Sequence, residues 1–588
     1  MAISKAASAQ RLRPLKSSRA TQRELLSLSP FELKDSLITL SNENARQGNY
    51  ALLNAGRGNP NWIATTPRNA FFLLGQFAIT ESERIWTAPD LGGMPGKAGI
   101  AKRLTAYLKA HAKAPGAAAL GQMVNYGIRE LKFEADAFVH ELVDAVIGDN
   151  YPVPDRMLVH TEKVVQAYLD QEMCDNKPPR GKFDIFAVEG GTAAMCYIFD
   201  SLETNGLLKK GDTIALAVPT FTPYIEIPEL DRYAFKVVRI DASNSLQEGN
   251  IGHVWQYPDA EIDKLRDPSI KAFFLVNPSN PPSVTMSPRS LKRIASIVKN
   301  DNPNLIVITD DVYGTFVDNF RSLMAEVPQN TIGVYSYSKY FGCTGWRLGV
   351  IAVHEKNIFD RMLTELPLPK QKALNRRYSS ISLTPEKIKF IDRMVADSRS
   401  VALNHTAGLS LPQQCQMALF SLFALADKKN RYKKLTQTIV QRRLKDLWKG
   451  LGVPQPVIPH QAGYYVELDL MVWAEAHYGP DFAAYLKENF ESVDLLFRLA
   501  ERFSVVLMDG GGFGGPRWSV RVSLANLPDA AYRQIGAHLA ELAPRYVNAW
   551  KDARAAEGNP VAQAKPAKKA VKTAPPSASK KAAKKAVK

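Results

Sequence analysis

The sequence predicts an α/β fold: a large domain with a mainly parallel sheet between helices, together with a smaller α+β domain. Three patterns lead to this prediction. From residue 184 onward, short apolar segments alternate with helical ones, which is typical of parallel strands buried on both faces. Residues 66–170 and 356–410 have helical patterns, and strand-like segments return after residue 460. The expected strands of the large sheet are residues 183–188, 213–218, 272–276, 305–309, 331–335 and 349–353.

The length and composition indicate two structured domains with basic ends. The chain has 588 residues, of which 45% are apolar and 9% aromatic, so it can bury large cores and is not a mainly disordered protein. The net charge of +17 is concentrated at the ends, because residues 1–23 carry six Lys or Arg, residues 558–588 carry nine Lys, and neither segment has an acidic residue. Residues 24–557 keep only +2, which does not indicate a nucleic-acid-binding body.

The spacing of the cysteines and the length of the apolar runs indicate the cellular compartment of the protein. The four cysteines lie far apart without a Cys-x-x-Cys pair, so we expect a reducing, cytoplasmic environment with neither disulfides nor a metal site. No apolar run reaches the roughly 20 residues that a membrane helix requires. The N-terminal segment is rich in Arg, Ser and Ala and lacks acids, which leaves an organelle transit peptide as an alternative to a plain basic arm.

These patterns divide the chain into five segments. The basic ends are expected to be disordered, and the polycationic C-terminal tail could bind polyanions weakly. The expected segments are the basic arm (1–25), the N-terminal part of the small domain with inserted helices (26–180), the large domain (181–400), the C-terminal part of the small domain (401–554) and the Lys/Ala/Pro-rich tail (555–588).

One lysine between two expected strands has an informative setting. Lys339 follows Ser336 and Ser338 and precedes, by eight residues, Arg347 in a Gly-x-Arg-x-Gly sequence. A lysine amine can form a Schiff base with a carbonyl cofactor, while Ser and Arg side chains can hold a phosphate group. This segment therefore suggests two anchor points for pyridoxal phosphate.

Other candidate residues follow earlier strands at the edge where ligands of parallel sheets bind. Glycines open a helix after the first strand, where backbone N–H groups and the helix dipole favour an anion. Later strand ends carry a Phe that could cover a planar ring, an Asn suited to a phenolate oxygen, an Asp suited to a protonated pyridine nitrogen, and a Tyr near that Asp. Asp311 is expected to be solvated or to cap a helix. The candidates are Gly191, Thr192, Ala193, Phe221, Asn277, Asp310 and Tyr313.

In this order and spacing, the motifs resemble the aspartate-aminotransferase superfamily, the fold-type-I pyridoxal-phosphate enzymes, over about residues 50–550. The resemblance implies a seven-stranded sheet, pyridoxal 5′-phosphate as cofactor, and Lys339 as the Schiff-base lysine that also moves a proton. It implies that Asp310 pairs with the pyridine nitrogen, and that Tyr313 and Asn277 bind the phenolic oxygen. Phe221 occupies the stacking position, where many relatives have Trp or Tyr.

The resemblance also implies a phosphate site and a homo-oligomer. Tyr151 lies in a Tyr-Pro-x-Pro sequence and resembles the tyrosine with which relatives reach the phosphate of the neighbouring subunit. We therefore expect a dimer unit with shared active sites, within a larger assembly if the inserted helices make further contacts. The residues implied to hold the phosphate are Gly191, Thr192, Ala193, Ser336 and Arg347.

Three residues are predicted to bind a small-molecule substrate. Arg521 lies in an Arg-x-Ser-x-Ala strand that, in this superfamily, supplies a planar donor for the α-carboxylate. Relatives place a loop like that around Gly58 against the substrate, and Arg57 stands there where a small apolar residue is usual. A cation at that place could hold a second carboxylate; the alternative is an arginine turned to solvent. The glycine-rich residues 509–516 precede a strand and are expected to form a flexible active-site loop.

The chain is longer than ordinary aminotransferases. Its length, the Gly-Arg-Gly-Asn-Pro-Asn-Trp loop and the Asn-Pro-Ser-Asn-Pro-Pro-Ser segment resemble the bacterial aspartate 4-decarboxylases, also called aspartate β-decarboxylases. That resemblance implies conversion of L-aspartate to L-alanine and carbon dioxide, with aminotransferase side activity. An aspartate or broad-specificity aminotransferase is the nearest alternative. A protein that associates with nucleic acid through its basic tail is a more distant one.

Overall fold

The computed structural model describes residues 12, 14–46, 50–86, 88–243, 253–402, 408–556 and 558. Its centre is a seven-stranded sheet in the order β2-β8-β7-β6-β5-β3-β4. The strands pair in parallel except at β8, which is antiparallel to both neighbours, so the prediction of a mainly parallel sheet is confirmed. The strands are β2 Phe183–Val188, β3 Thr213–Val218, β4 Lys236–Asp241, β5 Ile270–Val276, β6 Ile306–Asp310, β7 Thr331–Ser336 and β8 Gly349–His354.

The large sheet is buried on both faces, as its continuous apolar strands predicted. Along β5, Phe273 and Leu275 belong to one hydrophobic cluster, whereas Phe274 and Val276 belong to another. The edge strand β4 was missed by the sequence patterns because it is mostly exposed and carries charged residues between its apolar ones. The helices and short 3-10 turns of this part are α9 Gly191–Thr204, α10 Pro223–Glu229, α11 Asp259–Asp263, η1 Lys264–Arg266, α12 Pro288–Asn300, η2 Gly314–Phe316, α13 Leu323–Glu326, η3 Pro328–Asn330, η4 Thr344–Trp346, α14 Ile358–Glu365, α15 Leu368–Tyr378, η5 Pro385–Lys387 and α16 Phe390–Ala402.

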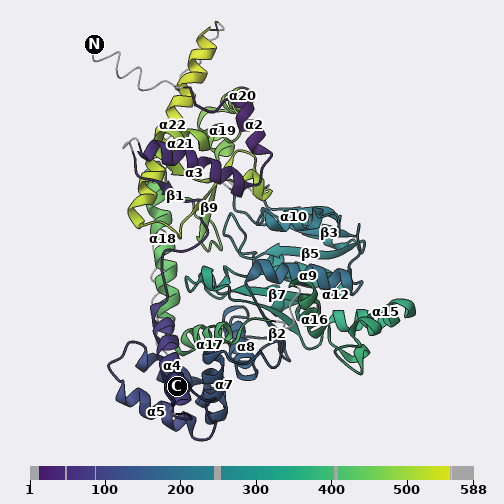
Figure 1. Ribbon diagram of the computed structural model, residues 1–588. Helices are drawn as coiled ribbons and strands as arrows, with labels where there is room; N and C mark the ends of the chain where they lie inside the picture. Colours follow the sequence, from purple (N-terminus) through teal and green to yellow (C-terminus); the bar gives the residue numbers. More distant parts are fainter. Residues whose placement is uncertain are drawn as a thin grey trace, which may run out of the picture.

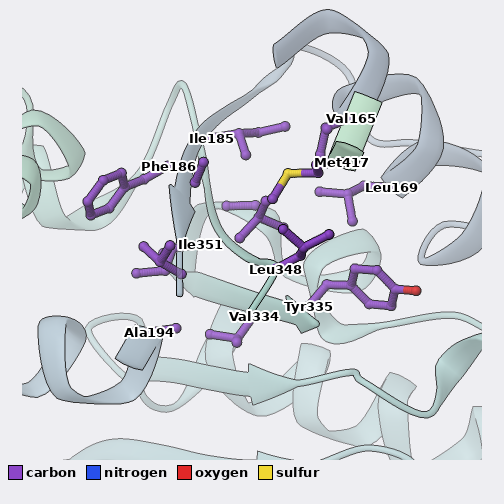
Figure 2. Close-up of a cluster of buried hydrophobic side chains, with 14 of the residues drawn as sticks. Val165, Leu169, Ile185, Phe186, Ala194, Val334, Tyr335, Leu348, Ile351 and Met417 are labelled. Atoms are coloured by element: carbon purple, nitrogen blue, oxygen red, sulfur yellow. The ribbon is translucent and has the colours of Figure 1, made fainter. Parts of the chain in front are cut away.

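A group of helices N-terminal to the sheet packs with it in one core. Figure 2 shows Val165 and Leu169 of α8 and Met417 of α17 beside Ile185 of β2 and Tyr335 of β7. Buried side chains of residues 64–180 and of α17, which were expected to lie in the small domain, thus share one hydrophobic cluster with the large sheet. These helices are α4 Thr65–Glu83, α5 Ile100–Ala110, α6 Ala117–Arg129, α7 Ala135–Ile147, α8 Val159–Glu172 and α17 Leu411–Ala426.

The small domain has a separate hydrophobic core at the other end of the molecule (Figure 1). A three-stranded antiparallel sheet in the order β11-β12-β9 and the parallel pair β1–β10 lie among its helices. The long helix α18 packs along α22 and reaches toward the helices below the sheet (Figure 1). The elements are α3 Pro30–Arg46, β1 Leu53–Asn54, α18 Arg431–Leu451, β9 Tyr465–Asp469, α19 Leu470–Tyr478, α20 Pro480–Asn489, α21 Asp494–Phe503, β10 Val505–Val506, β11 Met508–Asp509, η6 Gly511–Phe513, β12 Ser519–Ser523 and α22 Asp529–Ala556.

The expected disordered arm is partly wrong. Helix α2, Arg19–Leu26, is capped by Ser18, whose hydroxyl accepts a bond from the Thr21 N–H. Arg19 and Arg23 both bond to the carboxylate of Glu491, and this pairing explains why basic residues here are ordered. Residues 1–11 and 13 of the arm and residues 557 and 559–588 of the tail lie outside the described residues. No helix among the described residues is long and apolar enough to cross a membrane.

Candidate active site

Predicted site residues meet at the carboxyl-terminal edge of the large sheet. Gly191 begins α9, Asp310 ends β6 and Ser336 ends β7. A Cβ atom placed on Gly191 would lie 3.7 Å from Asp310 Oδ2, 3.9 Å from the Tyr224 hydroxyl and 4.0 Å from Ser336 Cβ. The parallel strands thus bring residues about 145 positions apart in the chain to one place, as the strand order predicted.

Asp310 is held by two donors inside the protein. Its Oδ2 accepts a 2.6 Å bond from the Tyr224 hydroxyl, and its Oδ1 accepts a 3.1 Å bond from the Val312 N–H. Burial raises the pKa of Asp310, although the two donors and the nearby charge of Lys339 act in the opposite direction. A cation placed beside this carboxyl would therefore favour its ionised form.

The amine of Lys339 lies where the sheet edge meets the loop around Gly58. Lys339 Nζ donates a 3.1 Å bond to the carbonyl oxygen of Gly58, which also accepts a 2.8 Å bond from the Tyr464 hydroxyl. A Cβ atom on Gly58 would lie 2.8 Å from the Tyr465 hydroxyl and 3.3 Å from Lys339 Nζ. Only glycine allows the loop to approach the amine this closely.

An anion-binding cradle lies at the start of α9. A Cβ atom on Gly190 would be 2.6 Å from Arg347 Nη2, so the missing side chain lets the guanidinium lie against the end of the helix. No described side chain caps this helix end, and its N–H groups remain available to an anion. Ser336 donates a 3.0 Å bond to Ser338 on the same edge. The predicted residues of the first helical turn are Gly191, Thr192 and Ala193.

Arg521 on β12 is 2% exposed and has only neutral partners. Its guanidinium donates bonds of 3.2 Å to Asn280 Oδ1 and 2.9 Å to the Gly56 carbonyl oxygen, and it also contacts the sulfur of Met508 at 2.6 Å. Its Nε is buried without a hydrogen-bond partner. Among the described residues no carboxylate forms an ion pair with it. A buried cation without a counterion is costly, so this arrangement favours binding of an anion.

Arg521 also lies between two aromatic rings. Its guanidinium carbon is 4.5 Å from the ring centre of Tyr465 and 4.7 Å from that of Phe513. The Tyr465 hydroxyl accepts a 3.1 Å bond from the hydroxyl of Tyr313, which ties the predicted cofactor residue to this group. The rings hold the guanidinium plane in one orientation without removing its charge.

The two asparagines of the Asn-Pro-Ser-Asn segment have different environments. The amide oxygen of Asn277 accepts bonds from the Thr285 hydroxyl at 2.8 Å and the Met286 N–H at 2.9 Å, which leaves its amide nitrogen buried without a partner. Asn280, three residues later, contacts Arg521. The sequence patterns singled out Asn277 alone, whereas the structure brings Asn280 beside the other candidate residues as well.

Three predicted residues lie at the margins of this arrangement. Phe221 packs against Phe31 and Tyr224, with ring centres 5.8 and 5.4 Å apart. Arg57 is exposed, and no described side chain forms an ion pair with it. Tyr151 is 76% exposed in the single chain. The structure thus leaves Arg57 and Tyr151 free to contact a ligand or a second subunit.

The expectation for Asp311 is wrong, because its side chain is fully buried instead of solvated or capping. Its carboxyl accepts bonds from the hydroxyls of Thr309 and Ser322. Burial raises the pKa of Asp311 to about 7. These bonds fix the turn after β6, and among the described residues they connect Asp311 to none of the predicted site residues.

The glycine-rich segment is tied to both domains. The carbonyl oxygen of Phe513 accepts a 2.8 Å bond from the Thr220 N–H, and that of Gly512 accepts a 3.0 Å bond from the Thr222 hydroxyl. A Cβ atom on Gly512 would be 2.2 Å from Pro30 Cγ. These contacts connect the segment before α10, and with it Phe221, to the small domain.

Sequence patterns missed several residues that complete the site. Except for Asn280, their side chains are aromatic or apolar and resemble ordinary core residues in the sequence. Only the pair of tyrosines after a glycine gave a signal that could have been followed. The missed residues are Tyr224, Asn280, Tyr464, Tyr465, Met508 and Phe513.

A lysine, a buried aspartate and an anion cradle at the edge of a mainly parallel sheet define a class of protein, and comparison with known proteins agrees with it. The family model of class I and II aminotransferases matches residues 188–539, so the chain belongs to this family. It is also 49% identical, over 531 residues, to the bifunctional aspartate aminotransferase and L-aspartate beta-decarboxylase of Pseudomonas sp; the match covers 90% of this chain and 98% of that protein.

Solved structures share the fold at low sequence identity. N-succinyldiaminopimelate aminotransferase from Mycobacterium tuberculosis is 17% identical, with 90% of this chain and 100% of that chain covered and a TM-score of 0.53. Bna3p from Saccharomyces cerevisiae, described as a putative kynurenine aminotransferase, is also 17% identical, with 91% of this chain and 100% of that chain covered and a TM-score of 0.53. The expected fold-type-I architecture is thereby confirmed.

Enzymes of this family depend on pyridoxal phosphate, and the residues present fit that group. The space left by Gly190 and Gly191 is bounded by a guanidinium, a helix N-terminus, a serine and a buried carboxyl. The lysine amine donates a hydrogen bond to the Gly58 carbonyl oxygen and forms no ion pair with a carboxylate among the described residues. This donor set matches a phosphate, a protonated pyridine nitrogen and an aldehyde.

Proposed function

We propose that this protein is a pyridoxal-phosphate enzyme that converts L-aspartate to L-alanine and carbon dioxide, with aminotransferase activity as a side reaction. The Pseudomonas relative is named for both activities, which supports this proposal. The observation that carries the proposal is the buried guanidinium of Arg521, which has neutral partners only and therefore suits a substrate carboxylate. In the net reaction the Cβ–Cγ bond breaks, its electron pair stays on Cβ, and a proton replaces the carbon dioxide that leaves.

The cofactor would be held by residues of the large domain. Arg347, Ser336 and the first turn of α9 would bind the phosphate; Asp310 would pair with the ring nitrogen. Tyr313, together with Asn277 or Asn280, would bond to the phenolic oxygen, and Phe221 would lie over the ring. Bound pyridoxal phosphate supplies an electron sink for the bonds at the substrate Cα and Cβ.

Lys339 would anchor the aldehyde carbon and move the proton. Its Nζ lies beside the Gly58 carbonyl oxygen, so the amine is oriented by one acceptor and has no carboxylate partner among the described residues. With the substrate bound, Nζ would remove the proton from Cα and return it later. The bond from Tyr464 to the same carbonyl oxygen keeps that acceptor in place.

The substrate would be oriented by two arginines of different environments. Arg521 would bind the α-carboxylate with its two-pronged donor face. Arg57, which is exposed beside Gly58, is the candidate for the second carboxylate, the one that is lost. A weaker, solvent-exposed hold on that carboxylate is compatible with its departure as carbon dioxide.

The assembly is proposed to be a homo-oligomer of dimers in the cytoplasm. The exposure of Tyr151 supports a role toward the phosphate of a neighbouring subunit. The four free cysteines, three of them buried, support a reducing compartment. Mass determination of the wild-type and Tyr151→Phe proteins would give their oligomeric states. Mixing of inactive Tyr151 and Lys339 variants would show whether active sites are shared. Restored activity on mixing supports shared sites, and its absence contradicts them.

The reaction is tested by incubating the protein, loaded with pyridoxal phosphate, with L-aspartate and no keto acid. We expect alanine and carbon dioxide in equal amounts over many turnovers. An aminotransferase would form at most one equivalent of oxaloacetate per site before it stops. That outcome would overturn the decarboxylase proposal and leave the aminotransferase alternative.

A polyanion-binding role of the tail is the second candidate, supported by its nine lysines. A variant that ends at residue 558 should keep full turnover, since the catalytic residues lie in the described part of the chain. Retention on a DNA column should fall and should depend on salt concentration in the full-length protein. Loss of turnover in the shortened variant would contradict this separation.

A further inference from the structure

Glu467 on β9 has no part in the function proposed above, yet it lies directly beside the substrate-binding strand. In the antiparallel pair β9–β12, Glu467 is the register partner of Arg521, so the two side chains leave the same face of the sheet. Glu467 is 5% exposed. Despite this proximity, the two side chains form no ion pair, and Arg521 bonds to neutral groups instead.

The bonds around Ser519 indicate the protonation state of Glu467. Ser519 Oγ is 2.7 Å from the carbonyl oxygen of Pro516 and 2.7 Å from Glu467 Oε1. A hydroxyl has a single proton, and the Pro516 oxygen can only accept. Both short contacts are satisfied together when Ser519 donates to Pro516 and Glu467 donates its own proton to Ser519.

The other oxygen of Glu467 leads to the same conclusion. Oε2 is buried and has no hydrogen-bond partner. An ionised carboxylate with an unpartnered buried oxygen is far more costly than a neutral carboxyl with an unpartnered carbonyl oxygen. In agreement, burial raises the pKa of Glu467 well above its ordinary value, and the nearby Asp469 and Asp509 raise it further, although the charge of Arg521 acts in the opposite direction.

The carboxyl also explains why glycines are needed in the segment after β11. A Cβ atom on Gly515 would meet Glu467 Oε1 first, and one on Gly510 would meet the Ser519 hydroxyl first and then Glu467 Oε1 at 2.7 Å. Between these glycines, Phe513 places its ring 4.7 Å from the guanidinium carbon of Arg521. The segment therefore wraps the Glu467 carboxyl and stacks on Arg521 at the same time.

We propose that Glu467 is a positioning residue that carries a proton: it holds the glycine segment and Phe513 in place while leaving the charge of Arg521 without a counterion until a substrate carboxylate binds. This inference rests on the proposed role of Arg521 in substrate binding. Deprotonation of Glu467 would place a negative charge behind the guanidinium and weaken its attraction for the carboxylate. The affinity for the substrate's carboxylate should therefore fall at high pH because Glu467 loses its proton.

The other charged groups facing Glu467 must be separated from it. Asp469 lies two residues away on β9 and pairs with His253; Asp509 ends β11 near Arg517. Burial raises the pKa of Asp509 to about 6, so Asp509 gains its charge near the lower end of the pH range of the test and provides the matched control.

The test measures binding of succinate, a dicarboxylate without the reacting amine, to the pyridoxal-phosphate-loaded protein by calorimetry from about pH 6 to about pH 9. We expect the Kd of the wild-type protein to rise by on the order of tenfold across this range. In Glu467→Gln the Kd should stay near the wild-type value at low pH throughout. In Asp509→Asn the rise should persist.

The outcomes separate this inference from the proposed function. An unchanged pH dependence in Glu467→Gln, a flat wild-type profile, or a tenfold weaker Kd in Glu467→Gln at low pH would each overturn the role of Glu467. If the Glu467→Gln protein does not bind pyridoxal phosphate, the Glu467→Met protein takes its place. The expectation is the same, because only the negative charge must be absent. Succinate binding that survives in Arg521→Ala would overturn the role of Arg521 and this inference together. Failure to form alanine, with succinate binding as expected, would overturn the reaction alone.

Discussion

The cofactor side and the substrate side of the site are assembled from different kinds of structure. Gly191, Asp310, Ser336 and Lys339 follow strands of one sheet, each at or just beyond a strand end. Arg521, by contrast, reaches its partners across large distances in the sequence, with Gly56 and Asn280 separated from it by 465 and 241 positions.

Because of this difference, the cofactor side is expected to be rigid and the substrate side to be more adjustable. The cofactor side rests on a continuously paired seven-stranded sheet, so a change there alters one group and leaves its surroundings in place. The substrate side depends on the glycine segment, on the Gly58 loop and on one strand of the small domain. A change there is expected to act on substrate binding, through the position of Arg521, more than on cofactor attachment.

The largest effect is expected for Lys339→Ala, because it removes the anchor and the proton carrier together. We expect turnover to fall by at least about 10⁴-fold and the visible absorbance of the lysine-bound cofactor to disappear. Lys292→Ala, an exposed lysine on α12, serves as the control and should match the wild type. A retained absorbance band would disprove the assignment of Lys339.

A smaller effect, confined to the substrate side, is expected for Arg521→Ala. The KM for aspartate should rise by about 100-fold or more because a buried charged donor is lost, while the absorbance of the bound cofactor stays normal. Arg517→Ala, an exposed arginine on the same segment, should have little effect. If Arg521→Ala also abolished cofactor binding, the two sides would not be separable as described.

Arg57→Ala should have a moderate effect, which tests whether Arg57 binds the second carboxylate on the substrate side. An exposed cation contributes less than a buried one, so we expect the KM for aspartate to rise by about tenfold. Because only the second carboxylate is affected, the ratio of alanine to transamination product should fall as well. An unchanged ratio would show that Arg57 is turned to solvent and that another group holds the second carboxylate.

The smallest effect on turnover is expected for Asp311→Asn, within about threefold, since this residue lies behind the cofactor side. Its stability effect should depend on pH. The pKa of Asp311 in the folded protein is about 7, above that of the unfolded chain, so between these values unfolding releases a proton. This contribution is present at low pH and is lost as the pH rises toward 7.

The measurement is urea unfolding of the cofactor-free protein at about pH 5 and about pH 8. The wild type should lose roughly 3 kcal/mol of unfolding free energy relative to Asp311→Asn between these conditions. Asp318→Asn, an exposed carboxyl, is the control and should show no such difference. Equal pH dependence in wild type and Asp311→Asn would contradict the assigned burial effect.

Much of the cofactor side could be predicted from sequence because each of its groups is marked locally. Apolar strands that end in Asp310 or precede Lys339 carry both the strand and the site in a short stretch of chain. The edge strand β4 was missed because an exposed strand lacks a continuous apolar run. The sequence did not show that residues 64–180 and α17 share a hydrophobic cluster with the large sheet, because a helical pattern indicates an apolar face and does not say which core that face joins.

The sequence alone determined the fold class, the cofactor and the order of the motifs, since strand periodicity and strand-end residues are local properties of the chain. Only the tertiary structure decided the surroundings of Arg521, the burial of Asp311 and the enclosure of Glu467 by Gly510 and Gly515. The distant segments that meet in the fold determine which groups are buried and which charges remain unpaired. They also determine which group donates the proton in a hydrogen bond. No window of sequence contains that information.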